Sequence, residues 1–272
     1  MEVMAATKIG FIGSGKMATA LAKGVIDSGF SQPADLIASD SYAGSREAFT
    51  QQTGIKTTGN NLEVLQQAEV VILEVKPQVL PAVLKELQAA ATAEHLFVSI
   101  VAGINLAALQ SAIAQSRHIR VMPNTPALVQ AGAAGIAVGD KATEEDSQLV
   151  SKLLGTVGLA IEVQEHLIDV VTGLSGSGPA YVFEMIEALS VGAVLMGLPR
   201  ATATQFAAQT LFGAAKMVLE TGEHPGILKD AVTSPGGTTI AGMQALDDKG
   251  LRAALIAAVQ AATLRSIELG GG

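Results

Sequence analysis

The segment GFIGSGKMATALAKG at residues 10–24 decides the fold of this chain. Gly13, Gly15 and Ala18 form a G-x-G-x-x-A pattern between an apolar run and an amphipathic stretch. Gly13 permits a tight turn, Gly15 lets the backbone approach a pyrophosphate, and small Ala18 allows a helix to pack closely on a strand. The alternative is a purely structural glycine turn. The pattern predicts the first strand, turn and helix of a dinucleotide-binding domain.

The residues up to 164 continue this pattern, because short β-branched runs alternate with amphipathic stretches. Such alternation is typical of a parallel sheet covered by helices. We therefore expect an α/β fold in which residues 1–164 form a Rossmann-type NAD(P)-binding domain. The predicted strands are 7–13, 35–40, 55–58, 70–75, 96–102, 118–122, 134–138 and 159–163.

Residues 165–272 lack strand patterns and are rich in alanine, which predicts an all-α domain. The expected helices are 179–196, 199–221, 238–248 and 251–269. Helix 179–196 carries Glu184 and Glu187 among residues that are otherwise mostly apolar, so one layer of neighbours cannot cover it. We expect a homo-oligomer that forms through this domain. The alternative is a tight monomeric bundle.

Composition narrows the class of protein. The chain has no cysteine, which excludes disulfides and thiolate metal sites and favours the cytoplasm. A net charge of −8 disfavours nucleic-acid binding. Apolar segments such as 188–198 fall short of the roughly 20 residues that a membrane span requires. The four histidines lack metal-ligand spacing, so no metal is expected and the histidines are interpreted as structural.

Cofactor-binding residues are expected where strands of the first domain end, because ligands of open α/β sheets lie beyond the carboxyl ends of the strands. The candidates are Gly13, Gly15, Lys16, Met17, Ser39, Asp40, Asn61, Val75, Lys76, Pro77, Ala102 and Gly103. Asp40 favours the ribose hydroxyl of NADH, whereas Ser39, Ser41 and Arg46 favour the extra phosphate of NADPH. Asp40 has the alternative role of capping a helix at 43–53, and Lys76 that of a solvated loop lysine.

Two further loops hold candidate functional residues. In VTSPGGTTIAGMQAL at 232–246, Gly236 and Gly237 precede Thr238 and Thr239 at a helix start, where free amides and hydroxyls favour an anion such as a substrate carboxylate. The alternative is a helix cap with nothing bound. MPNTPA at residues 122–127 is a rigid loop after the sixth strand and a candidate wall of the site.

The chain resembles pyrroline-5-carboxylate reductases along nearly its whole length. The segments that carry the resemblance are GFIGSGKMA at 10–18, EVKPQ at 74–78, MPNTPA at 122–127, DVVTGLSGSGPAYVF at 169–183, MGLPR at 196–200 and HPGILKDAVTSPGGTTI at 224–240. The resemblance implies reduction of pyrroline-5-carboxylate to L-proline by NADH or NADPH. It implies dimers, which often assemble into decamers.

The resemblance also implies roles for particular residues. Ser234 and Thr239 match the serine and threonine of the family's substrate loop. Thr239 would hydrogen-bond the substrate near its ring nitrogen, while amides from Gly237 to Thr239 hold the carboxylate. The proton for that nitrogen would come from solvent or through Thr239. Asn61, Lys76, Pro77 and Ala102 match cofactor-contacting positions.

Two alternative classes are weighed against this one. A β-hydroxyacid dehydrogenase depends on a helix-borne catalytic lysine, but Lys216, Lys229 and Lys249 lie in no glycine-rich helix motif. A non-catalytic nucleotide sensor would keep the fold without turnover. The phosphate turn and the second anion-binding loop both disfavour the sensor.

Overall fold

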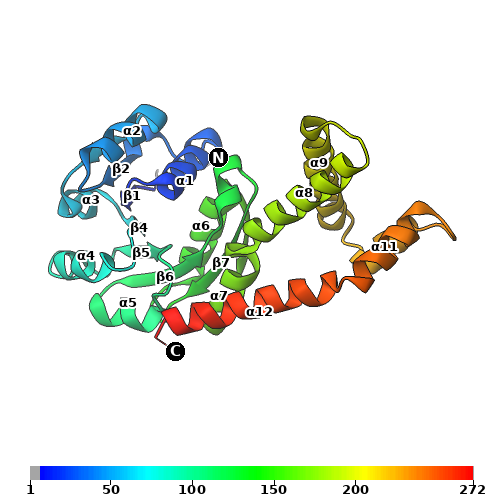
Figure 1. The fold of residues 1–272 in the computed structure, drawn as a ribbon. Coiled ribbons are helices and arrows are strands. Elements are labelled where there is room, and N and C mark those ends of the chain that lie inside the picture. The colour runs from blue at the N-terminus through cyan, green and yellow to red at the C-terminus, as the bar shows by residue number, and fades with distance from the viewer. Residues whose placement is uncertain (1–6, 272) are drawn as a thin grey trace. The chain divides into compact units, whose positions relative to one another are not determined.

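We describe residues 7–271 of a computed structural model. Two compact units make up the chain (Figure 1). The first runs to Gly176 and includes the chain from Ala261 onward, and the second comprises Ser177–Gln260.

The first unit is built on an eight-stranded sheet with the order β3-β2-β1-β4-β5-β6-β7-β8. The strands are β1 (Ile9–Ile12), β2 (Leu36–Ser39), β3 (Lys56–Thr58), β4 (Val70–Leu73), β5 (Leu96–Ser99), β6 (Arg117–Met122), β7 (Gly132–Val138) and β8 (Gly158–Glu162). Seven agree with the predicted strands within two residues at each end, and β5 ends three residues earlier than predicted, so the α/β fold is confirmed. All neighbours are parallel except β6 and β7.

The antiparallel β7 corrects the expectation of a parallel sheet. Only the 3-10 turn Thr125–Val129 and its flanking residues connect β6 to β7. A parallel return needs a crossover of about a dozen residues or more. The chain therefore reverses direction at this point, and the helix α6 (Glu144–Gly155) then provides the crossover from β7 to the parallel strand β8.

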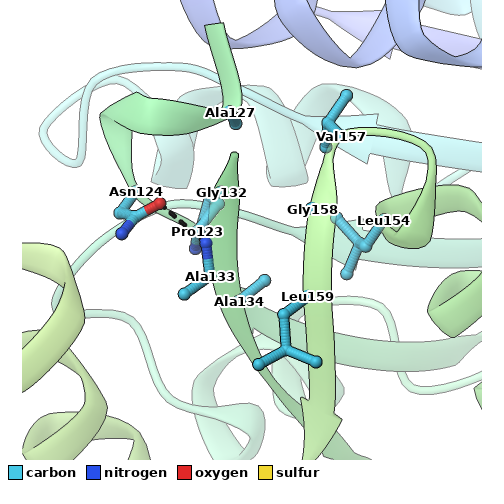
Figure 2. Close-up of a pocket in the computed structure, with 10 residues that line it drawn as sticks. All are labelled: Pro123, Asn124, Ala127, Gly132, Ala133, Ala134, Leu154, Val157, Gly158 and Leu159. Carbon is cyan, nitrogen blue, oxygen red and sulfur yellow. Dashed lines mark hydrogen bonds between the residues drawn. The ribbon is translucent and has the colours of Figure 1, made fainter. Parts of the chain in front are cut away.

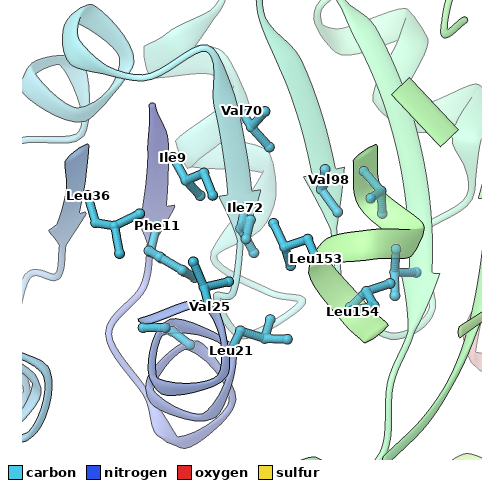
Figure 3. Packing of buried hydrophobic residues seen from close by; sticks show 14 of the residues in the cluster. Ile9, Phe11, Leu21, Val25, Leu36, Val70, Ile72, Val98, Leu153 and Leu154 are labelled. Carbon is cyan, nitrogen blue, oxygen red and sulfur yellow. The ribbon is translucent and has the colours of Figure 1, made fainter. Parts of the chain in front are cut away.

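Two hydrophobic clusters fill the two faces of the sheet. On β1, Ile9 and Phe11 contribute to one cluster and Ile12 to the other, as the two-residue repeat of a strand requires. Figure 3 shows the first cluster, in which Phe11 lies against Leu21 and Val25 of the helix α1 (Lys16–Asp27). The other helices that belong to these two layers are α2 (Ala43–Thr53), α3 (Asn61–Gln67), α4 (Leu80–Leu87), α5 (Leu106–Ala112) and α6.

The end of the chain is anchored in the first unit by a polar cluster. Arg120 on β6 is buried, and its guanidinium lies 3.5 Å from Glu165 and 3.8 Å from Asp169. Asp169 also accepts a hydrogen bond of 2.6 Å from Ser266, near the end of α12 (Leu251–Leu269). Asp169 lies in α7 (Ile168–Val171), which the 3-10 turn Glu165–Leu167 precedes and a π-helical turn, Thr172–Gly176, follows.

The second unit is helical, as predicted. Its helices are α8 (Gly178–Leu195), α9 (Arg200–Thr221), α10 (Pro225–Ala231), α11 (Thr238–Asp248) and the first part of α12. Four match the predicted helices within one residue at each end, whereas α10 was not predicted. It has seven residues, too few for a periodic pattern, and it begins at Pro225, where the His224 side chain accepts a hydrogen bond from the Gly226 amide.

The helices of the second unit leave much apolar surface exposed. Leu195 and Met196 at the end of α8 are 80% and 88% exposed, and Phe183, Phe206 and Phe212 are also exposed. Small side chains, among them the buried Ala203 and Ala207, bring α9 close to α8. Exposed apolar surface of this extent marks an interaction surface.

One helical run among the described residues, Glu165–Leu195, is long and apolar enough to cross a membrane. An 18-residue window of this run has a mean hydropathy of 1.3, and 6% of that window is buried. The run exceeds the short apolar segment expected from the sequence because the π-helical turn Thr172–Gly176 joins α7 to α8. Length and composition alone are weak evidence, since a helix that forms a subunit interface passes the same test.

Candidate functional site

The register of the sheet brings most of the predicted cofactor-binding residues to one edge. Ile12 at the end of β1 pairs with Ser39 at the end of β2 and with Leu73 at the end of β4. Leu73 pairs in turn with Ser99 at the end of β5. The loops that follow these parallel strands therefore leave the sheet side by side, at the edge where ligands of such folds bind.

The turn after β1 has the backbone that the glycine pattern predicts. Gly13 has φ +104°, and its amide donates to the Ser39 carbonyl over 2.8 Å. Gly15 is the N-cap residue of α1, and no side chain of its own caps the helix there. Lys16 and Met17 form the first turn of α1. These features fit a dinucleotide pyrophosphate, which helix N-terminal amides bind when no Cβ blocks the approach.

Asp40 folds back onto this turn. Its Oδ2 atom accepts hydrogen bonds from the amide and hydroxyl of Ser14, and its Oδ1 atom accepts one from the Tyr42 amide. The helix α2 begins at Ala43 with Tyr42 as its N-cap residue, so the alternative role of Asp40 as a helix cap is wrong. Arg46 donates to the Asp40 carbonyl oxygen over 2.6 Å.

Ser39 and Asn61 are joined across the sheet edge. The buried Ser39 hydroxyl donates to the Asn61 side-chain oxygen over 2.7 Å, and the Asn61 amide group donates to Glu86 over 2.8 Å. Asn61 begins α3, whereas the cap of that helix is Asn60. The chain of hydrogen bonds fixes the Asn61 side chain beside the end of β2.

Glu74 is the residue at this edge that sequence reasoning missed. It follows β4, and its Oε2 atom accepts a 2.9 Å hydrogen bond from the Gly15 amide. Burial raises the pKa of its carboxyl, while hydrogen bonds from the amides of Gly15, Met17 and Ala18 act in the opposite direction. A glutamate directly after an apolar strand, in EVKPQ, is the sequence signal that could have drawn attention to it.

The other predicted residues of this edge lie in the loops after β4 and β5. Val75 packs against the core, whereas Lys76 and Pro77 are exposed in a turn closed by a 2.9 Å hydrogen bond from the Val79 amide to the Lys76 carbonyl. Ala102 is exposed, and Gly103 has φ +74°. The positive charge of Lys76, the exposed backbone at Ala102 and Gly103, and the position of both loops at this edge suit contact with a nucleotide.

The predicted substrate residues form one turn of the second unit. The Gly237 amide donates to the Ser234 carbonyl over 3.1 Å, and Gly236 adopts φ +67°. Gly237 is the N-cap residue of α11 and receives no side-chain cap. Among residues 7–271, the amides of Thr238 and Thr239 have no hydrogen-bond partner. Ser234 is exposed and Thr239 half-buried. The turn therefore offers free donors to an anion.

The MPNTPA loop lines the small pocket that Figure 2 shows, together with the start of β7 and Leu154, Val157, Gly158 and Leu159. The Asn124 side chain accepts a hydrogen bond from the Ala133 amide and donates one to the Ser175 carbonyl. Asn124 thereby joins the loop to β7 and to the π-helical turn. Since both ends of this side chain are bonded and the other lining residues are apolar, the pocket is a packing defect.

Three of the four histidines make structural contacts, whereas His166 is exposed. His118 is buried on β6, stacks on Phe97, and its Nε2 atom lies 2.9 Å from the Ile113 carbonyl oxygen. Burial lowers the pKa of His118. His95 bonds the Thr92 amide and His224 caps α10. Within the described part of the chain, no group of three or more His, Asp or Glu side chains could hold a metal ion.

Comparison with known proteins fits this architecture. A family model described as pyrroline-5-carboxylate reductase dimerisation matches residues 165–269, and one described as NADP oxidoreductase, coenzyme F420-dependent, matches residues 8–103. A solved pyrroline-5-carboxylate reductase from Coxiella burnetii superposes with a TM-score of 0.92 at 35% identity, covering 97% of this chain and 99% of the other. The fold, the phosphate turn and these matches define a nicotinamide-dependent oxidoreductase with a helical dimerisation domain.

The sequence relatives are more specific. The chain is 49% identical to a pyrroline-5-carboxylate reductase of Arabidopsis thaliana, over 96% of this chain and 95% of that protein. It is 48% identical to a pyrroline-5-carboxylate reductase of Methanosarcina acetivorans, over 97% of this chain and 98% of that protein. A Plasmodium falciparum relative, solved with NADP bound, has a TM-score of 0.87 at 29% identity, covering 98% of this chain and 99% of that one. The chain belongs to the pyrroline-5-carboxylate reductase family.

Proposed function

We propose that this protein reduces L-1-pyrroline-5-carboxylate to L-proline with NADH or NADPH. The observation that carries the proposal is the turn before α11, whose Thr238 and Thr239 amides are free to bind a carboxylate, in a chain of this family. A bound reduced nicotinamide supplies the hydride that the imine carbon accepts. The chain's own residues bind and orient the reactants, and proximity is their main contribution to the rate.

The residues that would hold the cofactor are those predicted at the sheet edge. Amides at the start of α1, at Gly15, Lys16 and Met17, would bind the pyrophosphate, while Gly13 keeps the turn tight. Ser39, Asp40 and Asn61 would lie beside the adenosine ribose. Val75, Lys76, Pro77, Ala102 and Gly103 would contact the remainder of the nucleotide. The positive φ of Gly13 and the hydrogen-bonded Ser39 support these assignments.

The substrate would bind at the turn before α11. The free backbone amides of Thr238 and Thr239 would hold its carboxylate, while Gly236, Gly237 and Ser234 would form the turn around it. The Thr239 hydroxyl would hydrogen-bond the ring nitrogen. The N-cap residue of α11 is Gly237, and no side chain caps this helix. The Thr239 hydroxyl is therefore not used as a helix cap and is free for this role.

Steady-state kinetics of Thr239→Ala test the assignment. If the hydroxyl bonds the nitrogen mainly in the transition state, kcat and kcat/KM fall together by about ten- to a hundredfold, the value of one hydrogen bond of roughly 1.5 to 3 kcal/mol. Thr239→Ser keeps a hydroxyl and should restore most of the rate. Kinetics of Thr239→Ala within twofold of wild type, beside an unchanged denaturant melt, would remove Thr239 from the site.

We also propose the wider setting of the enzyme. Residues 1–164 would act as the cofactor-binding domain and 165–272 as the dimerisation and substrate-binding domain. Apolar side chains exposed on α8, α9 and α12 support assembly beyond a dimer, as in a decamer. The net charge of −8 and the lack of cysteine support a cytoplasmic enzyme that binds neither nucleic acid nor membranes.

A further inference from the structure

The Glu74 carboxylate lies where the cofactor's pyrophosphate would bind. Its Oε2 atom accepts a 2.9 Å hydrogen bond from the Gly15 amide, and the nearby amides of Met17 and Ala18 also favour its charged form. A Cβ atom added to Gly15 would meet its two oxygens at 2.7 and 2.9 Å. The space that a glycine leaves open above the helix start is therefore filled by a negatively charged group from the chain itself.

This contact is a poor device for stabilising the fold. Glu74 is half-buried, and burial raises the pKa of its carboxyl in spite of the amides that face it. The neighbouring Asp40 carboxylate, which holds the Ser14 amide, adds repulsion. A half-buried acid whose charged form is disfavoured, placed in a turn of this kind, is a feature that folds retain for function.

We propose that Glu74 sets the affinity for the cofactor by competing with its pyrophosphate for the amides at the start of α1. In the free protein the carboxylate occupies these amides, and binding of the nucleotide displaces it. Two groups of the same charge cannot share one set of donors, so part of the binding free energy is spent on moving Glu74. The inference rests on the proposed function, because it takes the α1 turn as the pyrophosphate site.

The same competition favours release of the oxidised nucleotide after hydride transfer. Once the nucleotide begins to leave, the carboxylate can return to the Gly15 amide. Glu74 is thus an affinity-determining residue of the proposed site rather than a catalytic one, since it touches no reacting atom.

Titration calorimetry at pH 8, well above the ordinary pKa of a glutamate, tests the proposal with NADPH and NADP⁺ as probes. Glu74→Gln, which removes the charge, and Glu74→Ala, which removes the whole group, should each bind the nucleotides about tenfold or more tightly than wild type. Glu69→Gln is the matched control, because Glu69 is an exposed acid just before β4, at the opposite end of that strand. Its Kd should stay within twofold of wild type.

A purely structural cap would give the reverse pattern. Glu74→Gln and Glu74→Ala would then lower the melting temperature of the free protein. Their Kd for the nucleotides would be unchanged or higher than that of wild type. If both variants show a Kd that is unchanged or higher, the proposal is overturned. Gly15→Asp distinguishes a failure of the cofactor-site assignment from a failure of the role proposed for Glu74. If this folded variant binds as tightly as wild type, the turn is not the pyrophosphate site and the cofactor assignment falls as well. If it loses binding while the Glu74 variants match wild type, only the role of Glu74 is wrong.

Discussion

The two glycines of the phosphate turn should respond differently to the same small substitution. In Gly13→Ala, the added Cβ would lie 1.8 Å from the Glu74 carbonyl oxygen, and the residue would have to hold φ +104°. That carbonyl belongs to the backbone at the end of β4, where the Glu74 amide donates to Ile12 over 2.8 Å. In Gly15→Ala, the Cβ would meet only the carboxylate of Glu74, at the far end of a flexible side chain.

The structure gives the size of the difference. Strained backbone at Gly13 costs about 1–3 kcal/mol, and relief of the clash breaks at least one backbone hydrogen bond worth about 1 kcal/mol. Gly13→Ala should therefore lose about 2–4 kcal/mol of unfolding free energy. Gly15→Ala has an ordinary extended backbone, φ −79° and ψ −166°, and should lose at most about 1 kcal/mol while binding NADPH at least tenfold more weakly. Urea melts and calorimetry measure both quantities. Equal stability losses in the two variants would refute the reasoning.

Two further predictions concern stability with pH and assembly. Burial lowers the pKa of His118, so below about pH 6.5 the unfolded chain binds a proton at this residue more readily than the folded chain does. The free energy of unfolding therefore falls as the pH falls below about 6.5, by at most about 1.4 kcal/mol per pH unit. Urea melts from pH 7.5 to 5.5 should show a shallower loss for His118→Gln and an unchanged one for the exposed His166→Gln, and identical slopes would contradict this origin. Light scattering at micromolar protein should give at least twice the chain mass of 27.7 kDa, and a monomer mass would contradict assembly through the helical unit.

The sheet could be predicted from the sequence because its strands are short apolar runs buried on both faces. Val70, Val71, Ile72 and Leu73 are all buried, so the run stands out without any alternation. The long helices could also be predicted, since Pro and Gly mark their ends. The direction of β7 was not predicted, because a strand has the same hydrophobic pattern in either direction. Only the short connection after β6 shows that the chain reverses there.

The candidate site was predicted only where a local pattern carries it. Gly13 and Gly15 belong to one turn, and Gly236 and Gly237 to another, so spacing along the chain is enough to find them. Glu74 is 59 residues from Gly15, and its contact exists only because β1 and β4 are neighbours in the sheet.

The contact of Glu74 with Gly15 also changes how the glycine pattern should be understood. A G-x-G-x-x-A turn is usually described by what it leaves open, namely donors and space for a phosphate. In this chain the register of β4 against β1 brings a carboxylate into that space, and the register brings Asp40 beside it from β2. The same strand order that builds the proposed nucleotide site therefore also brings in the carboxylate that we propose as its competitor. The pattern predicts where a pyrophosphate binds, but how tightly it binds depends on the residues that neighbouring strands place over the turn.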